Sequence, residues 1–236
     1  MPDFSTRSYD KELLDRNDIP FADIKRNMQE LEIINSRLGG HAITIKGFSD
    51  ICKNLHSPEL TICEIGCGGG DNLKAIDHWC RKQKRNVRFI GIDINPDCIN
   101  YANENCAEMD NVEFIVADYQ LTQFKGPQPD IIFSSLFSHH LDDAQFTDML
   151  RWCRQHARSG FFINDLHRHY LAYYSIKFLT RLFSKSYLVK NDAPLSVRRG
   201  FSRKELERLL ATAGIKNYRI RWKWAFRWLV TVSNEG

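Results

Sequence analysis

LTICEIGCGGG (Leu60–Gly70) and VRFIGID (Val87–Asp93) are the two runs that decide the fold of this chain. The first is a short apolar run that ends at the acid Glu64 and passes directly into a glycine loop, Gly66–Gly70. A helical segment separates it from the second apolar run, which also ends at an acid. Strand, glycine turn, helix, strand and terminal acid is the layout of a site for a nucleotide-type cofactor.

Length and composition limit the classes of protein to be considered. The chain has 236 residues, of which 43% are hydrophobic and 26% charged, which predicts one α/β domain with at most a small cap. No apolar run approaches the roughly 20 residues that span a bilayer, and Met1–Asp10 lacks a signal-peptide pattern. We therefore expect a cytoplasmic protein. Its seven cysteines form no CxxC pair, which predicts reduced, mostly buried thiols and no metal site.

The net charge of +4 is unevenly distributed. Residues 166–228 hold fifteen Lys and Arg against three acids. Such a basic segment suits an anionic partner or a membrane surface, but it is equally compatible with an ordinary solvated face. The charge pattern alone leaves these alternatives open.

The residues before the first strand are predicted to be helical and to form an N-terminal cap over residues 1–58. A proline start signal precedes apolar residues spaced three and four apart over Phe21–Leu38. Gly39-Gly40 then ends this helix, and a second helix follows over His41–Leu55. We expect both helices to pack over a sheet edge and the mouth of the cofactor site.

From Leu60 onward, strands and helices alternate, which predicts a parallel sheet with helices on both faces. The predicted strands are Leu60–Glu64, Val87–Asp93, Val112–Val116, Asp130–Ser135 and Gly160–Asp165. The predicted helices between them are Asp71–Arg81, Pro96–Ala107 and Asp143–Ala157.

After the fifth strand the rhythm changes. An aromatic-rich helix over His169–Ser186 and a polar loop over Asn191–Gly200 are predicted to form a helical lid insertion at about residues 167–200. Ser202 and Glu205 then have the spacing of a capping box at the start of a further helix. The alternating tail, residues 218–232, predicts a β-hairpin that closes the sheet antiparallel.

The glycine loop disfavours a dinucleotide cofactor. Dinucleotide sites have a glycine at the sixth position of the loop, where the pyrophosphate meets the helix N-terminus. Asp71 occupies that position here, and its carboxylate would repel the phosphates. Asp93 can instead accept hydrogen bonds from two ribose hydroxyls, and Asp118 can accept one from an exocyclic amine such as that of adenine, with Tyr119 beside the ring. An NAD oxidoreductase is disfavoured.

Three segments together resemble the first motifs of class I S-adenosylmethionine (SAM)-dependent methyltransferases: Glu64–Gly70, Ile92-Asp93 and Ala117-Asp118. The resemblance covers about Leu60–Asp165. It implies a Rossmann-like, seven-stranded α/β sheet with an antiparallel last strand over residues 59–236, and SAM as the cofactor. The cofactor-binding residues that it implies are Glu64, Gly66, Gly68, Gly70, Asp93, Ile94, Asp118, Tyr119 and Ser135.

The acceptor is predicted from the run SSLFSHHL at Ser134–Leu141. Class I methyltransferases that act on base amino groups often have an Asn/Asp-Pro-Pro-aromatic run after the fourth strand. This chain has neither the proline nor the amide there. The run is similar to that of ubiquinone- and menaquinone-type and polyketide-tailoring methyltransferases. A small aromatic or lipophilic acceptor, methylated on a phenol oxygen or an activated carbon, is therefore expected, and nucleic acid is not.

Histidines that follow the strands are candidates for the base that takes the proton of a phenol. His140 and His139 follow the fourth strand and are preferred. His167 and His169 follow the fifth strand on the same edge, and Asp165 is a rival base or orienting group. In the cap, His41 is a candidate for contact with the cofactor carboxylate.

The aromatic segment Tyr170–Leu188 admits two interpretations. It is either a helix packed on the core or a lid that lines an apolar acceptor pocket. Its lysines and arginines also suit contact with anionic lipid at the inner membrane face. Two alternative functions remain open, an RNA or protein methyltransferase that uses the basic C-terminal third and a non-catalytic SAM-binding partner. The oligomeric state is not indicated.

Overall fold

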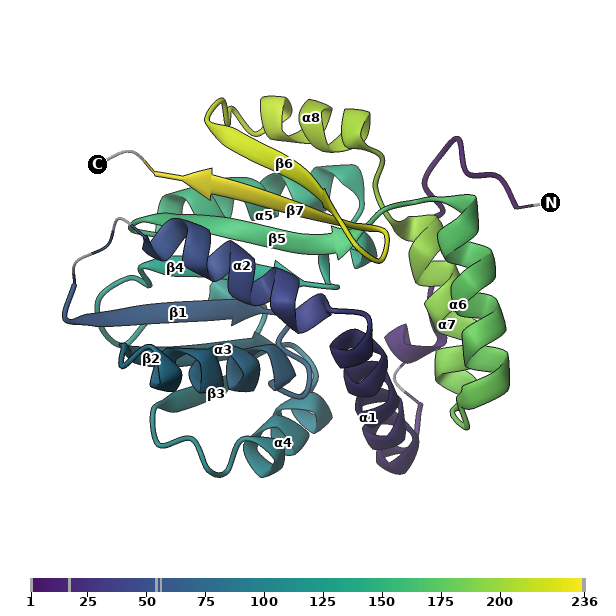
Figure 1. Ribbon diagram of the computed structural model, residues 1–236, viewed down its shortest axis with the longest axis horizontal. Coiled ribbons are helices and arrows are strands. Elements are labelled where there is room, and N and C mark those ends of the chain that lie inside the picture. The colour runs from purple at the N-terminus through teal and green to yellow at the C-terminus, as the bar shows by residue number, and fades with distance from the viewer. Residues whose placement is uncertain (1, 17, 54, 56, 235–236) are drawn as a thin grey trace.

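A single twisted sheet forms the centre of the computed structural model, which describes residues 2–16, 18–53, 55 and 57–234. Within these residues the strand order is β3-β2-β1-β4-β5-β7-β6 (Figure 1). Strands β1 to β5 pair in parallel, and β7 runs antiparallel to both β5 and β6. The strands are β1 Glu59–Ile65, β2 Asn86–Asp93, β3 Val112–Val116, β4 Ile131–Ser135, β5 Gly160–Leu166, β6 Tyr218–Lys223 and β7 Arg227–Ser233. The predicted Rossmann-like sheet with an antiparallel last strand is confirmed.

The helices predicted between the strands are present, with ends that shift by a residue or two. The helices are α1 Phe21–Arg37, α2 Gly40–Cys52, α3 Asp71–Lys82, α4 Pro96–Asn105, α5 Asp143–His156, α6 Tyr170–Phe183, α7 Tyr187–Arg199 and α8 Arg203–Thr212, with short 3-10 turns at η1 Leu13–Asp15, η2 Tyr119–Leu121 and η3 Ser138–His140. The second predicted helix ends earlier than Leu55, and Asn54 within its predicted range lies outside the described residues.

The core has one apolar layer on each face of the sheet. Side chains of α5 and α8 fill one layer and those of α2 and α3 fill the other. Helix α2 comes close to the sheet because Gly47 has no side chain, since a Cβ there would lie 2.5 Å from the ring of Phe162. Helix α1 lies beyond the carboxyl ends of the parallel strands, on the same side of the sheet as α6 and α7 (Figure 1).

The prediction of a polar loop over Asn191–Gly200 is wrong, because these residues belong mainly to helix α7. Ser186 caps this helix by accepting a hydrogen bond from the N–H of Val189, and Pro194 lies inside it. The polar residues that favoured a loop have partners elsewhere. Asp192 is buried and accepts hydrogen bonds from main-chain N–H groups of the N-terminal turn η1, at 2.8 and 3.0 Å. A prediction from local sequence alone does not include such long-range contacts, so it missed this helix.

Two other predictions about side chains are confirmed. Ser202 and Glu205 form the capping box of α8. All seven cysteines are free and buried. Among the described residues, no helix combines the length and apolarity required to cross a bilayer.

Candidate active site

The glycine loop lies between the carboxyl end of β1 and the start of α3. Gly66, Gly68 and Gly70 all have positive φ angles, of 67°, 50° and 75°, which glycine adopts without the steric cost of a Cβ. A Cβ on Gly66 would lie 2.3 Å from the ring of Phe137, whereas a Cβ on Gly68 would meet no atom within 4 Å. Packing therefore requires the first glycine, and the backbone at Gly68 faces open space in which a ligand can approach it.

Asp93 connects the end of β2 to this loop. Its Oδ2 accepts a hydrogen bond from the N–H of Gly68 at 2.9 Å, and its Oδ1 accepts one from the N–H of Asn95 at 2.9 Å. Burial raises the pKa of Asp93, and the two main-chain bonds act against that rise. The adjacent Ile94 is 71% exposed, so an apolar surface stands beside the carboxylate.

Glu64 is fully buried beneath the loop. Its Oε1 accepts a hydrogen bond from Asn72 at 2.9 Å, while Oε2 has no partner among the described residues. Burial raises the pKa of Glu64 well above its usual range, and the negative charges of Asp71 and Asp93 add to the rise. Three carboxyl groups thus surround one short glycine loop.

The helical segment before β1 also reaches this place. His41 of α2 lies with its Nε2 2.8 Å from Oδ2 of Asp71, and Asn35 of α1 lies 3.5 Å from the same oxygen. The structure therefore brings His41 to the N-terminus of α3, next to the glycine loop.

The remaining residues expected to bind the cofactor lie after β3 and β4. Asp118 caps η2 by accepting a hydrogen bond from the N–H of Gln120. Tyr119 is buried edge-on against Trp152, and burial raises its pKa to about 12. Its ring thus belongs to the core beneath the site. Ser135 is buried at the end of β4 with its Oγ 3.3 Å from the amide nitrogen of Asn164.

The two preferred histidines lie together in η3, directly after β4. His139 is buried with its Nδ1 2.8 Å from Oδ1 of Asp165, whereas His140 is partly exposed with its Nδ1 3.2 Å from Oδ1 of Asp15. Burial acts to raise the pKa of Asp165, but the charge and hydrogen bond of His139 outweigh it and hold this pKa below its usual range. His139 and its carboxylate therefore form a buried pair at the carboxyl edge of the sheet.

The second pair of histidines occupies a separate place. His167 packs against Trp228 and accepts a hydrogen bond from Trp222 at 3.3 Å. Burial, together with the charges of His169 and Arg168, lowers its pKa to about 4. His169 caps α6 through its Nδ1. These two histidines are engaged in aromatic packing and helix capping.

Sequence reasoning missed the N-terminal residues that complete the histidine cluster. Glu12 is buried with Oε1 3.7 Å from Nε2 of His139 and Oε2 3.9 Å from Nε2 of His140. Burial raises the pKa of Glu12, although the charge of His140 lowers it in part. Arg199 donates to the carbonyl oxygens of both histidines, at 3.1 and 2.8 Å. The segment before residue 16 has no apolar period, so nothing in the sequence pointed to these contacts.

Buried Arg227 was also missed. It stands at the start of β7, beside the end of β5, and its Nη1 has no hydrogen-bond partner among the described residues. Burial lowers its pKa to about 10, against the influence of Asp165 and Asp71. A cationic group therefore lies at the same sheet edge as the carboxylates.

Part of the chain is similar to a known family. Residues 62–160 match the family model described as a methyltransferase domain. No curated protein sequence matches.

Solved structures share the fold across most of the chain. The plantazolicin methyltransferase BpumL, solved with S-adenosylhomocysteine, is 17% identical with a TM-score of 0.63, over 90% of this chain and 99% of that one. Human N-acetylserotonin methyltransferase, solved with SAM, is 17% identical with a TM-score of 0.65, over 92% and 57%. Magnesium protoporphyrin IX methyltransferase from Synechocystis is 12% identical with a TM-score of 0.57, over 85% and 82%. Residues 62–160 thus match a methyltransferase domain, and the chain shares the fold of methyltransferases solved with SAM or S-adenosylhomocysteine, as its motifs predicted.

A test of the buried carboxyl group uses Glu64→Gln. Because the folded protein holds the Glu64 proton that the unfolded chain releases above a pKa of 4.5, unfolding releases a proton. The free energy of unfolding of the unliganded wild type then falls by up to about 1.4 kcal/mol per pH unit until the folded pKa is reached. Glutamine has no proton to release. Urea unfolding should therefore show that the free energy of unfolding of the variant, relative to that of the wild type, increases as the pH rises above about 5. Exposed Glu108→Gln is the control and should show no trend, and an equally flat difference for Glu64→Gln would refute the buried proton.

Proposed function

We propose that this chain uses its methyltransferase domain to transfer the methyl group of SAM to a small aromatic or lipophilic acceptor. The observation that carries the proposal is the open glycine loop at Gly68, surrounded by the carboxyl groups of Glu64, Asp71 and Asp93. This combination of open backbone and negative charge selects among the cofactors that such a loop can hold.

The charge of the loop favours a cationic ligand. A dinucleotide would bring its pyrophosphate toward Asp71 at the N-terminus of α3 and meet like charge at short range. SAM carries a sulfonium and an ammonium group, and both gain from nearby carboxylates. In the unliganded protein burial and the negative charges of Asp71 and Asp93 keep the proton on Glu64, and a cationic ligand nearby would favour its ionised form.

Each expected cofactor residue has a place in this proposal. Asp93 accepts hydrogen bonds from the ribose hydroxyls, and exposed Ile94 packs on the adenine ring. Asp118 accepts a bond from the adenine amine, and buried Tyr119 supports that end of the site from below. His41, held by Asp71, faces the carboxylate of the methionine part. Gly66, Gly68 and Gly70, with Ser135 at the end of β4, line the path between the two ends.

The acceptor is proposed to bind at the carboxyl edge of β4 and β5, where ligands bind in sheets of this type. Methyl transfer is an in-line displacement at the sulfonium, so the protein's main task is to place the acceptor atom. His140, partly exposed in η3, orients an acceptor hydroxyl by hydrogen bonding, and His139 behind it is fixed by Asp165. The similar structures include methyltransferases of N-acetylserotonin and magnesium protoporphyrin IX, which supports an aromatic acceptor.

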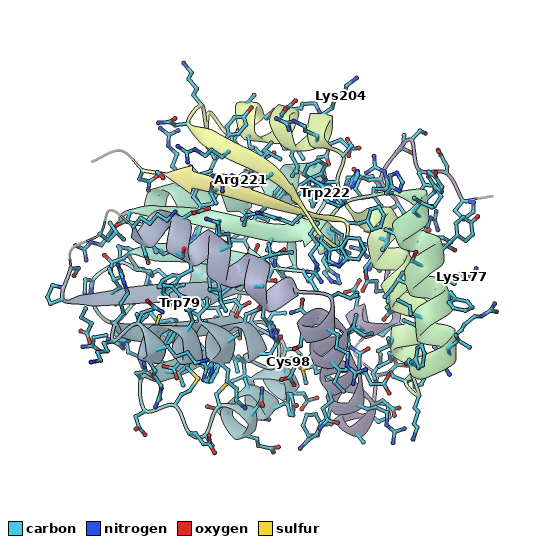
Figure 2. The ribbon with its side chains drawn as sticks, in the orientation of Figure 1. Trp79, Cys98, Lys177, Lys204, Arg221 and Trp222 are labelled. Carbon is cyan, nitrogen blue, oxygen red and sulfur yellow. The ribbon has the colours of Figure 1, made fainter. Side chains whose placement is uncertain are left out.

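Helix α6 supports a lipophilic acceptor and contact with a membrane surface. Its large apolar side chains are exposed: Tyr170, Leu171, Tyr174, Phe178, Leu179, Leu182 and Phe183. The helix has no acidic residue, and Lys177, Arg181 and Lys185 recur along it and just beyond it. Figure 2 shows Lys177 on the side of α6 that faces away from the sheet. An apolar face with flanking basic residues suits an anionic lipid surface from which the acceptor would be drawn.

The alternative of an RNA substrate for the basic C-terminal third gains no support. Arg168, Arg199 and Arg227 point inward and are buried. Arg168 pairs with Glu205, and Arg199 pairs with Asp15. Part of the positive charge in this segment therefore lies in the protein interior. Fewer cations are exposed to a phosphate backbone than the number of Lys and Arg residues suggests.

Asp93→Ala tests the cofactor site. Loss of two charge-assisted hydrogen bonds to ribose should weaken SAM binding by about 2–5 kcal/mol in isothermal titration. Asp93→Asn keeps an acceptor for the Gly68 N–H and separates loop anchoring from charge. Exposed Asp110→Ala is the control. A dissociation constant unchanged by Asp93→Ala would contradict the assignment of this strand end to the ribose.

His140→Ala tests the acceptor side. The acceptor is first identified by incubating the protein and labelled SAM with cell extract and searching for a methylated product. Because a displaced hydroxyl reacts poorly, kcat for that acceptor should fall by about a hundredfold or more, while the dissociation constant of SAM stays the same. Exposed His78→Ala should leave both unchanged. Collapse of cofactor affinity in His140→Ala would make this histidine a cofactor residue.

A double change on α6, Phe178→Glu with Phe183→Glu, tests the membrane contact. Burying one large apolar side chain contributes about 1.5–3 kcal/mol, so losing two should lower partition onto phosphatidylserine-containing vesicles by at least about a hundredfold. Leu121→Glu replaces an equally exposed apolar residue elsewhere and should bind as the wild type does. Equal sedimentation of all three proteins with vesicles would refute a membrane-binding α6.

A further inference from the structure

We propose that Glu12, His139 and His140 form a binding site for one divalent transition-metal cation, with Zn²⁺ as the simplest occupant. The site lies where the N-terminal turn η1 meets the histidine turn η3 after β4. It goes beyond the proposed methyl transfer, because its donors are not those proposed to hold SAM, and it shares His139 and His140 with the proposed acceptor side.

The donor atoms already converge on one point. One oxygen of Glu12 lies 3.7 Å from Nε2 of His139, the other lies 3.9 Å from Nε2 of His140, and one ligand atom from each residue lies within 4.8 Å of the others. Ligand atoms around a tetrahedral Zn²⁺ with bonds of about 2.1 Å are about 3.4 Å apart. A small contraction therefore gives metal geometry. The present distances are also too long for direct hydrogen bonds between these groups.

The orientation of both imidazole rings agrees with metal binding. Nδ1 of His139 faces a carboxylate oxygen of Asp165 at 2.8 Å, and Nδ1 of His140 faces one of Asp15 at 3.2 Å. A carboxylate accepts, so each ring, when neutral, carries its proton on Nδ1 and turns the lone pair of Nε2 toward Glu12. The two nitrogen lone pairs and the carboxylate then face one another with no proton between them. A bound cation would remove this repulsion.

Each ligand also has the outer partner that metal ligands usually have. Asp165 holds His139, Asp15 holds His140, and the hydroxyl of Ser196 donates to Oε1 of Glu12 at 2.7 Å. The backbone of the turn is fixed as well, because Arg199 and Arg7 donate to carbonyl oxygens of residues 139–141. The three donors are thus held in place before any ion arrives.

Charge favours a cation at this place. The carboxylates of Glu12, Asp15 and Asp165 lie around the histidines, and Arg199 pairs with Asp15. Buried Arg227 also acts on Asp165, so with neutral imidazoles three negative charges face two positive charges. Arg7 pairs with Asp143, which Arg208 shares, and Asp192 is engaged by main-chain N–H groups of η1.

The donor set identifies the class of ion. Two imidazoles and one carboxylate suit Zn²⁺, Fe²⁺, Mn²⁺ or Co²⁺ rather than Ca²⁺ or Mg²⁺, and such sites leave a coordination position open. The expectation of no metal was based on cysteine spacing. That spacing carries no information about Glu12, His139 and His140, which only the fold brings together. A bound ion would tie the N-terminal segment to the loop after β4.

The test measures metal binding itself. Untagged protein is stripped with a chelator and titrated with Zn²⁺ by calorimetry, and the Co²⁺-loaded protein is followed by visible absorption. We expect one ion per chain. Glu12→Gln and His139→Gln should each weaken Zn²⁺ binding by more than a hundredfold. Asp15→Asn removes no ligand and changes the outer partner of His140, so it should weaken binding by about 10–100-fold. Exposed His78→Ala is the matched control and should bind as the wild type does.

Folding and function are separated from the metal readout. Far-ultraviolet circular dichroism and SAM titration on each variant show whether the fold and the cofactor site persist. Retention of one ion per chain by both Glu12→Gln and His139→Gln would place the metal elsewhere and overturn the proposal. So would a wild type that binds neither Zn²⁺ nor Co²⁺ stoichiometrically, in which case the cluster is a set of ion pairs only. Neither result would bear on SAM binding.

Discussion

The hydrogen bond from the Gly68 N–H to the carboxylate of Asp93 is the contact on which the site depends. It exists because β1 and β2 pair in parallel and end side by side, with Ile65 opposite Ile92. The loop that leaves β1 must turn sharply there, and three glycines with positive φ allow the turn. The same register places Asp71 at the start of α3 and Glu64 directly beneath it. Sheet pairing thus concentrates three carboxyl groups around an open stretch of backbone.

The two sides of the site differ in how they are built. The cofactor side is local, since every residue proposed for it except His41 lies between β1 and β4. The acceptor side is assembled from distant parts of the chain, with η3 after β4, Asp165 at the end of β5, and Glu12 and Asp15 from the N-terminal turn. Arg199 of α7 joins these parts by bonding both the histidine backbone and Asp15. The N-terminal segment is therefore part of the acceptor side and not merely a cover over it.

This difference explains what the sequence could and could not predict. Strands such as Val112–Val116, the Ser202–Glu205 capping box and the glycine loop depend on neighbours in sequence, and all were predicted. Helix α7 was missed because the polar residues that resembled a loop, Asp192 above all, find partners in η1. Glu12 carried no signal because its role comes from two histidines that only the fold brings near. For Tyr119, the motif indicated a position just after β3 but not the direction of the side chain, which turns into the core.

The central claim is that the carboxylate-lined glycine loop binds SAM. Isothermal titration of the wild-type chain with SAM, S-adenosylhomocysteine and NAD⁺ tests it most directly. The account predicts that SAM and S-adenosylhomocysteine each bind with one molecule per chain and that NAD⁺ does not bind. Binding of NAD⁺ in place of both, or binding of none of the three, would contradict it.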